Sequence, residues 1–152
     1  MPVGFAETVR LRLMRYFESE LVAMPGIGSV LSAINSPVCV ASSSAPERLR
    51  YSLSLVGLLS RFDPHIFSAT QVAHGKPAPD LFLFAAAQMG VEPRKCLVIE
   101  DSVAGVRAAA AAGMDVIGFA GGSHCRPGHV ERLRHAGAAE VINDFAALLS
   151  LI

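Results

Sequence analysis

Apolar positions along this chain fall into short runs that alternate with longer stretches of helical spacing. Residues 5–21, FAETVRLRLMRYFESEL, repeat apolar side chains with a helical period and place acids and arginines on the other face, which predicts an amphipathic helix. The run VCVA at residues 38–41 is short, apolar and β-branched, which is typical of a strand buried on both faces of a parallel sheet. Hydroxyl residues and a proline follow it, and helical spacing then continues to Leu58, so residues 42–58 are predicted to form the next helix.

The same alternation continues to the end of the chain and indicates the fold class. Strands alternating with helices predict an α/β fold with a mostly parallel sheet covered on both faces. We expect Asp80 to cap one of the helices, and Gly90 and Gly113 to end two of them. The further strands are predicted at residues 65–70, 96–99, 115–120 and 139–142, and the further helices at residues 29–34, 81–89, 102–112 and about 127–135, with a short one at the end.

Composition narrows the class of protein. A chain of 152 residues with 52% hydrophobic residues and no net charge fits one compact globular domain and lacks the basic footprint of a nucleic-acid binder. No apolar run approaches the roughly 18 to 20 residues that a membrane span needs, and residues 1–20 carry acids and arginines where a signal peptide would be apolar. We therefore expect a cytoplasmic protein with neither a nucleic-acid nor a membrane partner. Its three cysteines are widely spaced, which indicates neither a disulfide framework nor a zinc ribbon.

Residues that follow the predicted strands are the first candidates for chemistry, because parallel sheets bind ligands at the carboxyl ends of their strands. Ser42 follows the first strand at the start of a helix, where free N–H groups and the helix dipole favour an anion. A simple helix N-cap is the alternative there. Lys76 lies in the segment HGKPAPD, whose prolines brace the loop, with an ordinary solvated lysine as the alternative.

Two adjacent acids, Glu100 and Asp101, stand at the end of the apolar strand 96–99. One acid at this junction would be explained as a helix cap, worth about 1 kcal/mol. Two acids repel each other and resist desolvation, so a bound hard cation such as Mg²⁺ explains the pair better. With Ser42 and Lys76, they predict a site for a phosphate and its magnesium.

The segment HCRPGH places His124, Cys125 and His129 close together in the sequence. Their spacing matches no common metal motif, so we interpret the segment as a surface loop, with a metal site as the alternative. Because the segment follows the strand at 115–120, it lies at the same edge of the sheet as the other candidates.

These segments resemble the motifs of the haloacid dehalogenase superfamily, in particular of its β-phosphoglucomutase-like sugar-phosphate phosphatases. VCVASSS is similar to the second motif, HGKPAPD to the third, and VIEDSVAGVRAAAAAGM to the fourth. The resemblance implies a Rossmann-like, three-layer α/β sandwich and a phosphohydrolase that depends on Mg²⁺. It also implies that Ser42, the Ser43 backbone and Lys76 hold the phosphate, that Asp101 binds magnesium, and that Glu100 is a second ligand or supports the first.

The first motif of the superfamily, D-x-D, has no counterpart in this chain. That motif would supply the aspartate nucleophile, and no two of the five aspartates stand in it: Asp63, Asp80, Asp101, Asp115 and Asp144. The resemblance assigns residues 1–22 to a helical remnant of the cap domain and residues 23–152 to the α/β core. It places the absent strand at the centre of the sheet, between the strands at 38–41 and 96–99.

Two unpaired strand edges would forfeit several hydrogen bonds at about 1 kcal/mol each. We therefore expect these two strands to pair directly, or another chain or segment to fill the slot, or the chain to be a marginally stable fragment. Two functions stay open. One is a magnesium-dependent phosphatase or phosphomutase for a small phosphorylated metabolite, with a sugar phosphate as the expected class, truncated here and inactive alone. The other is a non-catalytic phosphate-binding, metal-binding or assembly module that self-associates through its sheet edges.

Overall fold

The structure is a computed structural model that describes residues 18–152. Most of the predicted amphipathic helix at 5–21, and of the cap remnant at 1–22, lies outside the described residues. Among residues 18–152, no helix is both long enough and apolar enough to cross a membrane. The strands are β1 (Val40–Ser42), β2 (Ile66–Ser68), β3 (Leu97–Glu100), β4 (Asp115–Phe119) and β5 (Glu140–Ile142). The helices are α2 (Ile27–Ala33), α3 (Pro46–Leu55), α4 (Leu59–Phe62), α5 (Asp80–Met89), α6 (Val103–Ala111) and α7 (His129–Ala136), with 3-10 turns η1 (Ala69–Gln71), η2 (Pro93–Lys95) and η3 (Phe145–Ser150).

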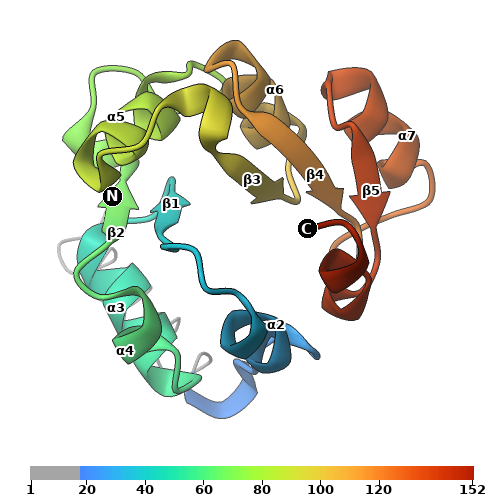
Figure 1. Ribbon diagram of the computed structural model, residues 1–152. Helices are drawn as coiled ribbons and strands as arrows, with labels where there is room; N and C mark the ends of the chain where they lie inside the picture. Colours follow the sequence, from blue (N-terminus) through green and yellow to red (C-terminus); the bar gives the residue numbers. More distant parts are fainter. Residues whose placement is uncertain (1–17) are drawn as a thin grey trace, which may run out of the picture.

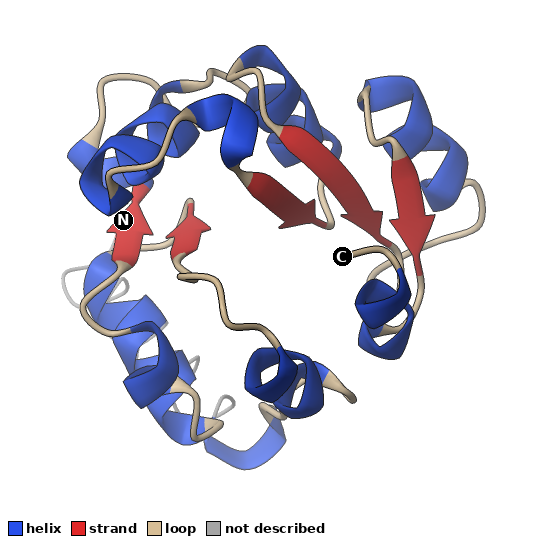
Figure 2. Cartoon of the chain, viewed as in Figure 1, coloured by secondary structure: helices blue, strands red, loops and turns tan. Residues whose placement is uncertain are grey.

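All strand pairs in the described residues are parallel, which confirms the predicted α/β class. The strands form two sheets, one of β1 and β2 and the other in the order β3, β4, β5. Val40 pairs with Ile66 in the first sheet, and Val98 pairs with Val116 in the second. β1 and β3 are not hydrogen-bonded to each other, so direct pairing, one of the three alternatives for these strands, is wrong. Figures 1 and 2 show the two sheets as separate parts of one arc of strands.

Helices cover both faces of the strands, as the continuous apolar runs predict. On one face, α5, α6 and α7 bury Val116 of β4 in a cluster that includes Val106 and Leu133. On the other face, Ile117 of β4 packs against Val30 of α2. Adjacent strand residues point to opposite faces, so each strand contributes to both layers of core. The arrangement is a three-layer sandwich (Figure 2).

Two helices hold the two sheets together across the interruption. In α2, Val30 packs with β4 and β5, while the next residue, Leu31, packs with β2 and α4. In α5, Phe82 joins the α6 and α7 cluster, while Leu81 joins Phe67 of β2. Burial of an apolar side chain of this size stabilises a fold by roughly 1.5 to 3 kcal/mol. Side-chain packing therefore joins β1 to β3 where backbone pairing does not.

The helix ends agree with the sequence in part. Gly90 and Gly113 end helices α5 and α6 with positive φ angles of 66° and 74°, as predicted. The helix expected over residues 42–58 begins only at Pro46 and gives way to α4 after Gly57, whose φ of 70° leaves the helical region. Asp80 is not an N-cap, because it is already the first residue of α5. Its carboxylate instead accepts a hydrogen bond from the backbone N–H of His74 (3.3 Å).

Candidate active site

Lys76 lies at the carboxyl ends of β1 and β3 and links the two sheets. Its Nζ donates a hydrogen bond to the main-chain carbonyl of Ala41 in β1 (3.2 Å) and forms an ion pair with Glu100 at the end of β3. The same ammonium lies 4.7 Å from the centre of the Phe82 ring on α5. The side chains of Lys76 and Glu100 are each only 9% exposed. Lys76 and Glu100, which the sequence predicted to lie at the same edge of the sheet, are therefore in contact there as a buried ion pair.

The Glu100 carboxylate has a donor for each of its oxygens. Oε1 pairs with Lys76, and Oε2 accepts from the backbone N–H (3.1 Å) and the hydroxyl (3.0 Å) of Ser102. The Ser102 hydroxyl in turn accepts from the N–H of Gly105 and caps α6 (3.0 Å). Burying a carboxylate is costly unless it is paired and hydrogen-bonded, and this one is both. Within the described part of the chain, no buried side-chain nitrogen or oxygen lacks a partner.

Gly105 makes the close approach of Glu100 to α6 possible. A Cβ atom at this position would lie 2.0 Å from Cδ of Glu100, which is closer than any real contact. The position requires glycine because the carboxyl group occupies the space of a side chain. The sequence contains this glycine in DSVAGV, but it does not show which group lies against it.

The turn after β1 is held by a residue that sequence reasoning missed. Ser42 ends β1, and its hydroxyl accepts from the backbone N–H of Ser44 (3.2 Å). The N-cap of α3 is Ala45, so Ser42 is not a helix cap and that alternative is wrong. Ser68, at the end of β2, is fully buried and donates its hydroxyl to the carbonyl of Ser44 (2.7 Å). Ser68 thereby fixes the turn that carries Ser42, and its only signal in the sequence was a hydroxyl at the end of a weak strand.

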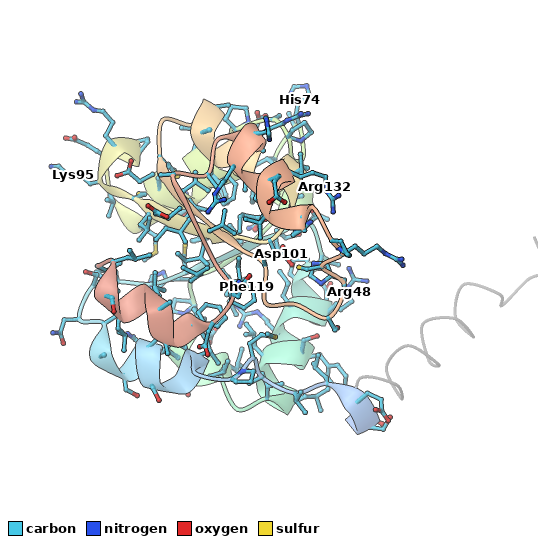
Figure 3. The ribbon with its side chains drawn as sticks, turned by 90° about the vertical axis from the view of Figure 1, so that its right-hand side faces the viewer. Arg48, His74, Lys95, Asp101, Phe119 and Arg132 are labelled. Carbon is cyan, nitrogen blue, oxygen red and sulfur yellow. The ribbon has the colours of Figure 1, made fainter. Side chains whose placement is uncertain are left out.

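Asp101 differs from its neighbour Glu100 because its side chain is 50% exposed. One carboxylate oxygen, Oδ2, lies 3.2 Å from Nε2 of His124, and the main-chain carbonyl accepts from Nε2 of His129 (2.7 Å). Figure 3 shows Asp101 in the side-chain view. An accessible carboxylate at the end of a strand is the kind of oxygen ligand that a hard cation prefers.

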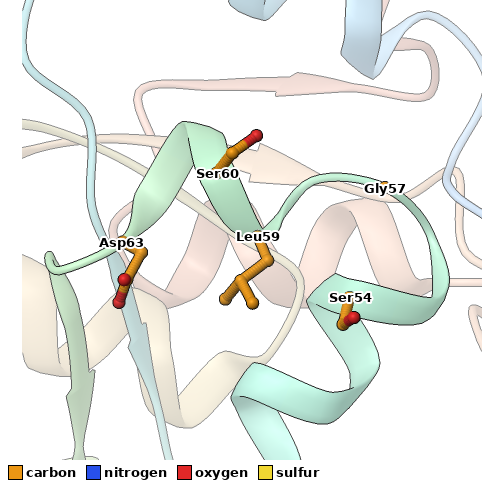
Figure 4. A pocket seen from close by; sticks show the side chains of 5 residues that line it. All are labelled: Ser54, Gly57, Leu59, Ser60 and Asp63. Atoms are coloured by element: carbon orange, nitrogen blue, oxygen red, sulfur yellow. The ribbon is translucent and has the colours of Figure 1, made fainter.

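The pocket drawn in Figure 4 lies beside α3 and α4, which precede the amino end of β2. It has a volume of about 370 Å³ and is lined by residues of α3 and α4 and the turns beside them, namely Ser54, Gly57, Leu59, Ser60 and Asp63. These residues lead into the start of β2, whereas ligands of parallel sheets bind at the carboxyl ends. Its one acid, Asp63, is already paired with Arg50. This pocket therefore does not compete with the edge at Lys76 as a candidate site.

Comparison with known proteins places these features in a family. Residues 4–113 match the family model described as haloacid dehalogenase-like hydrolase. The chain is 36% identical over 118 residues to a 6-phosphogluconate phosphatase of Escherichia coli, an alignment that covers 78% of this chain and 53% of that protein.

Two solved structures are similar over nearly the whole chain. One is a haloacid dehalogenase-like protein of unknown function from Agrobacterium tumefaciens, with 40% identity, a TM-score of 0.90, and coverage of 99% of this chain and 69% of that one. The other is a family hydrolase from Deinococcus radiodurans with bound phosphate and sodium, with 34% identity, a TM-score of 0.85, and coverage of 99% and 67%. The chain spans about half the length of the curated relatives that it matches.

Proposed function

This chain belongs to the haloacid dehalogenase-like hydrolases, and we propose that it provides the phosphate-binding and magnesium-binding half of a phosphoric monoester hydrolase. The observation that carries this proposal is the ammonium group of Lys76, held between the ends of β1 and β3 by Ala41 and Glu100. A fixed cation beside a serine turn and an accessible carboxylate suits a phosphate with its metal. The substrate class that we propose is a small phosphorylated metabolite of the sugar-phosphate type, since one relative is a 6-phosphogluconate phosphatase.

In this proposal each residue of the site has a separate binding role. Lys76, the Ser42 hydroxyl and the Ser43 backbone bind the phosphoryl oxygens. Asp101 binds Mg²⁺, because its carboxylate is exposed and of the right donor type. Glu100 serves mainly to position Lys76, since Lys76 and Ser102 already occupy both of its oxygens. Magnesium in such a site neutralises charge on the phosphoryl group and orients it.

The covalent nucleophile is the part of the machinery that these residues do not supply. None of the five aspartates stands in a D-x-D pair, and removing a covalent nucleophile lowers the rate by about 10⁶. We therefore expect the 152 residues to bind phosphate with Mg²⁺ and to hydrolyse p-nitrophenyl phosphate near the background rate. Robust magnesium-dependent hydrolysis by the purified chain would contradict this expectation.

Titration calorimetry with inorganic phosphate and Mg²⁺ tests the binding site. Asp101→Asn should weaken magnesium-dependent phosphate binding at least about tenfold, because it removes the charge that attracts the metal. The matched control is Asp115→Asn, another exposed acid but at the opposite end of a strand, which should bind as the wild type does. Absence of phosphate binding at millimolar concentration, or equal effects of the two substitutions, would overturn the proposal.

The absence of a D-x-D pair also favours a second candidate, a non-catalytic phosphate-binding or assembly module. In the described residues, the facing edges of β1 and β3 have no strand partner, which gives an assembly module a surface for pairing. Light scattering tests self-association, and a monomer at high concentration would contradict that version. An in-frame D-x-D in the coding DNA upstream of Met1 would favour the hydrolase, and a stop codon directly upstream would favour the module.

A further inference from the structure

Three side chains that the proposed phosphate chemistry does not use converge on the segment that joins β4 to α7. They are His124 and Cys125 in the loop and His129, the first residue of α7. One ring nitrogen of each histidine and the Cys125 sulfur all lie within 4.8 Å of one another. Cys125 and His129 are half-buried and His124 is exposed, so an ion from solvent can reach the group.

The separation of two of these atoms matches that of ligands on one ion. Nε2 of His124 lies 3.7 Å from Sγ of Cys125. A tetrahedral zinc ion with Zn–N of about 2.0 Å and Zn–S of about 2.3 Å holds its nitrogen and sulfur roughly 3.5 Å apart. Only a small shift of side chains is therefore needed to place one ion between them.

Both histidine rings are oriented by their surroundings. Gly122 leaves the space that His124 fills, since a Cβ atom there would lie 2.7 Å from Cε1 of His124. Nε2 of His129 faces the main-chain carbonyl of Asp101 at 2.7 Å and must donate to it, because a carbonyl only accepts. The remaining nitrogen of His129, Nδ1, therefore carries a lone pair. A carbonyl that accepts from one ring nitrogen is the usual support for a histidine that binds metal through the other.

Asp101 and Arg132 face the cluster and have opposite effects on metal binding: the carboxylate favours a bound cation and the guanidinium opposes it. Oδ2 of Asp101 lies 3.2 Å from Nε2 of His124, close enough to approach the same ion as a fourth ligand. A guanidinium nitrogen of Arg132 lies 3.3 Å from Nδ1 of His129 and competes with a cation for that lone pair. Arg132 lies on α7 (Figure 3) and is exposed, so its side chain can turn into solvent.

We propose that His124, Cys125 and His129 bind one borderline transition-metal ion of the Zn²⁺ class, with the Asp101 carboxylate or a water in the fourth position. Two imidazoles and a thiolate select such an ion over Mg²⁺, which prefers oxygen ligands. Binding releases the thiol proton of Cys125 to solvent. This site goes beyond the proposed phosphate chemistry. With water in the fourth position it leaves Asp101 to the magnesium role proposed above, and its three protein ligands do not depend on that role.

Titration of the full chain with Co²⁺, a spectroscopic substitute for Zn²⁺, tests the ligand set. We expect thiolate-to-cobalt charge-transfer absorption that saturates at one equivalent and disappears when Zn²⁺ is added. Cys125→Ser should abolish the absorption, and the control Cys96→Ser, at another half-buried cysteine, should keep it. Absorption that persists in Cys125→Ser, or that never appears in the wild type, would overturn the proposal.

Two further substitutions should change the Zn²⁺ affinity in opposite directions. Arg132→Gln removes the competing cation, and we expect binding that is about two- to tenfold tighter. Gly122→Ala displaces the His124 ring without removing a ligand, and we expect binding that is about 10- to 100-fold weaker. Circular dichroism checks that both variants remain folded. Equal affinities in these two variants and the wild type would exclude the site.

Alkylation of the wild-type chain gives a test that needs no substitution. Zn²⁺ should slow the reaction of Cys125 with iodoacetamide by at least about tenfold, because the bound thiolate is no longer a free nucleophile. Cys39 and Cys96 are internal controls, since burial raises the pKa of both thiols and neither lies in the cluster. Equal slowing of all three cysteines, measured by mass spectrometry, would count against the proposal.

Discussion

Glu100 and Asp101 are adjacent acids at the end of one strand, yet the structure gives them opposite surroundings. Glu100 is 8% exposed, and both of its oxygens are occupied by Lys76 and Ser102. The Asp101 side chain is 50% exposed, and its Oδ2 lies 3.2 Å from Nε2 of His124. The first acid belongs to a closed, buried network that joins two sheets. The second lies at the surface beside His124, where solvent reaches it.

Of these two neighbouring charges, the buried one supports the fold and the exposed one is available to bind. A buried charge with all its partners resists change, because losing one partner leaves the other uncompensated. Substitution of an exposed charge changes the free energy of unfolding little, because water already solvates it. Stability measurements should therefore respond strongly to substitutions around Glu100 and weakly to those at the surface.

The largest effect is expected from removing the cation of the buried network. Lys76→Met should lower the free energy of unfolding by roughly 3 to 5 kcal/mol, because it leaves the Glu100 charge buried without its partner. The matched control is Lys95→Met, whose ion pair with Glu92 is exposed and 3.8 Å long, and about 0 to 1 kcal/mol is expected there. Urea denaturation measures both.

The double variant Lys76→Met with Glu100→Gln tests whether the unpaired charge of Glu100 causes this loss. Because the second substitution removes the uncompensated charge, part of the lost stability should return. If Lys76→Met costs no more than Lys95→Met, the network at Glu100 does not stabilise the fold in the way described.

A smaller loss is expected where Glu100 packs against α6. Gly105→Ala places a methyl group in the space of the carboxyl, and overpacking of this kind typically costs about 1 to 3 kcal/mol. In α2, Gly28 has no atom within 4 Å of its Cβ position, so Gly28→Ala should instead stabilise the protein by roughly 0.5 to 1 kcal/mol. Thermal unfolding distinguishes the two signs, and a gain in both variants would contradict the packing described here.

The smallest effect concerns the exposed pair that braces the loop of Lys76. The hydrogen bond from the His74 side chain is the main reason that the pKa of Asp80 lies below its ordinary value of 3.8. A lowered folded-state pKa means that this contribution to stability is complete above pH 3.8 and is lost as the pH falls through the folded-state pKa. His74→Ala should raise the pKa of Asp80 toward 3.8 in an NMR titration. An unchanged titration curve would show that His74 is not the cause.

Much of the fold was predictable because local patterns determine it. Short β-branched runs such as VCVA predicted the strands, and the glycines at 90 and 113 predicted the ends of helices. The break after α3 was missed because the apolar spacing continues through Gly57, and only the backbone shows that this glycine leaves the helix. The assignment of Asp80 as an N-cap was wrong because the helix begins one residue earlier than expected. Pro79 is the N-cap, and Asp80 is the first residue of α5.

The candidate site also combines residues that the sequence identified with residues that only the structure revealed. Motif spacing alone pointed to Ser42, Lys76, Glu100 and Asp101 at one edge of the sheet, and the structure places Lys76 and Glu100 in contact. Spacing did not reveal the roles of Ser68 and Gly105, because their partners are far away in the sequence or unseen in it. It also favoured a plain loop at HCRPGH, because the spacing of His124, Cys125 and His129, which the structure brings together, matches no common metal motif.

The order of strands and helices, the parallel α/β class and the groups at the strand ends could be read from the sequence, because they follow from local periodicity and from the direction of the chain. The division of the strands into two sheets joined by α2 and α5, and the position of Lys76 between those sheets, could not. The tertiary structure also decided that Glu100 is enclosed while Asp101 is open. The physical reason is that burial and pairing depend on residues distant in the chain, which no local pattern records.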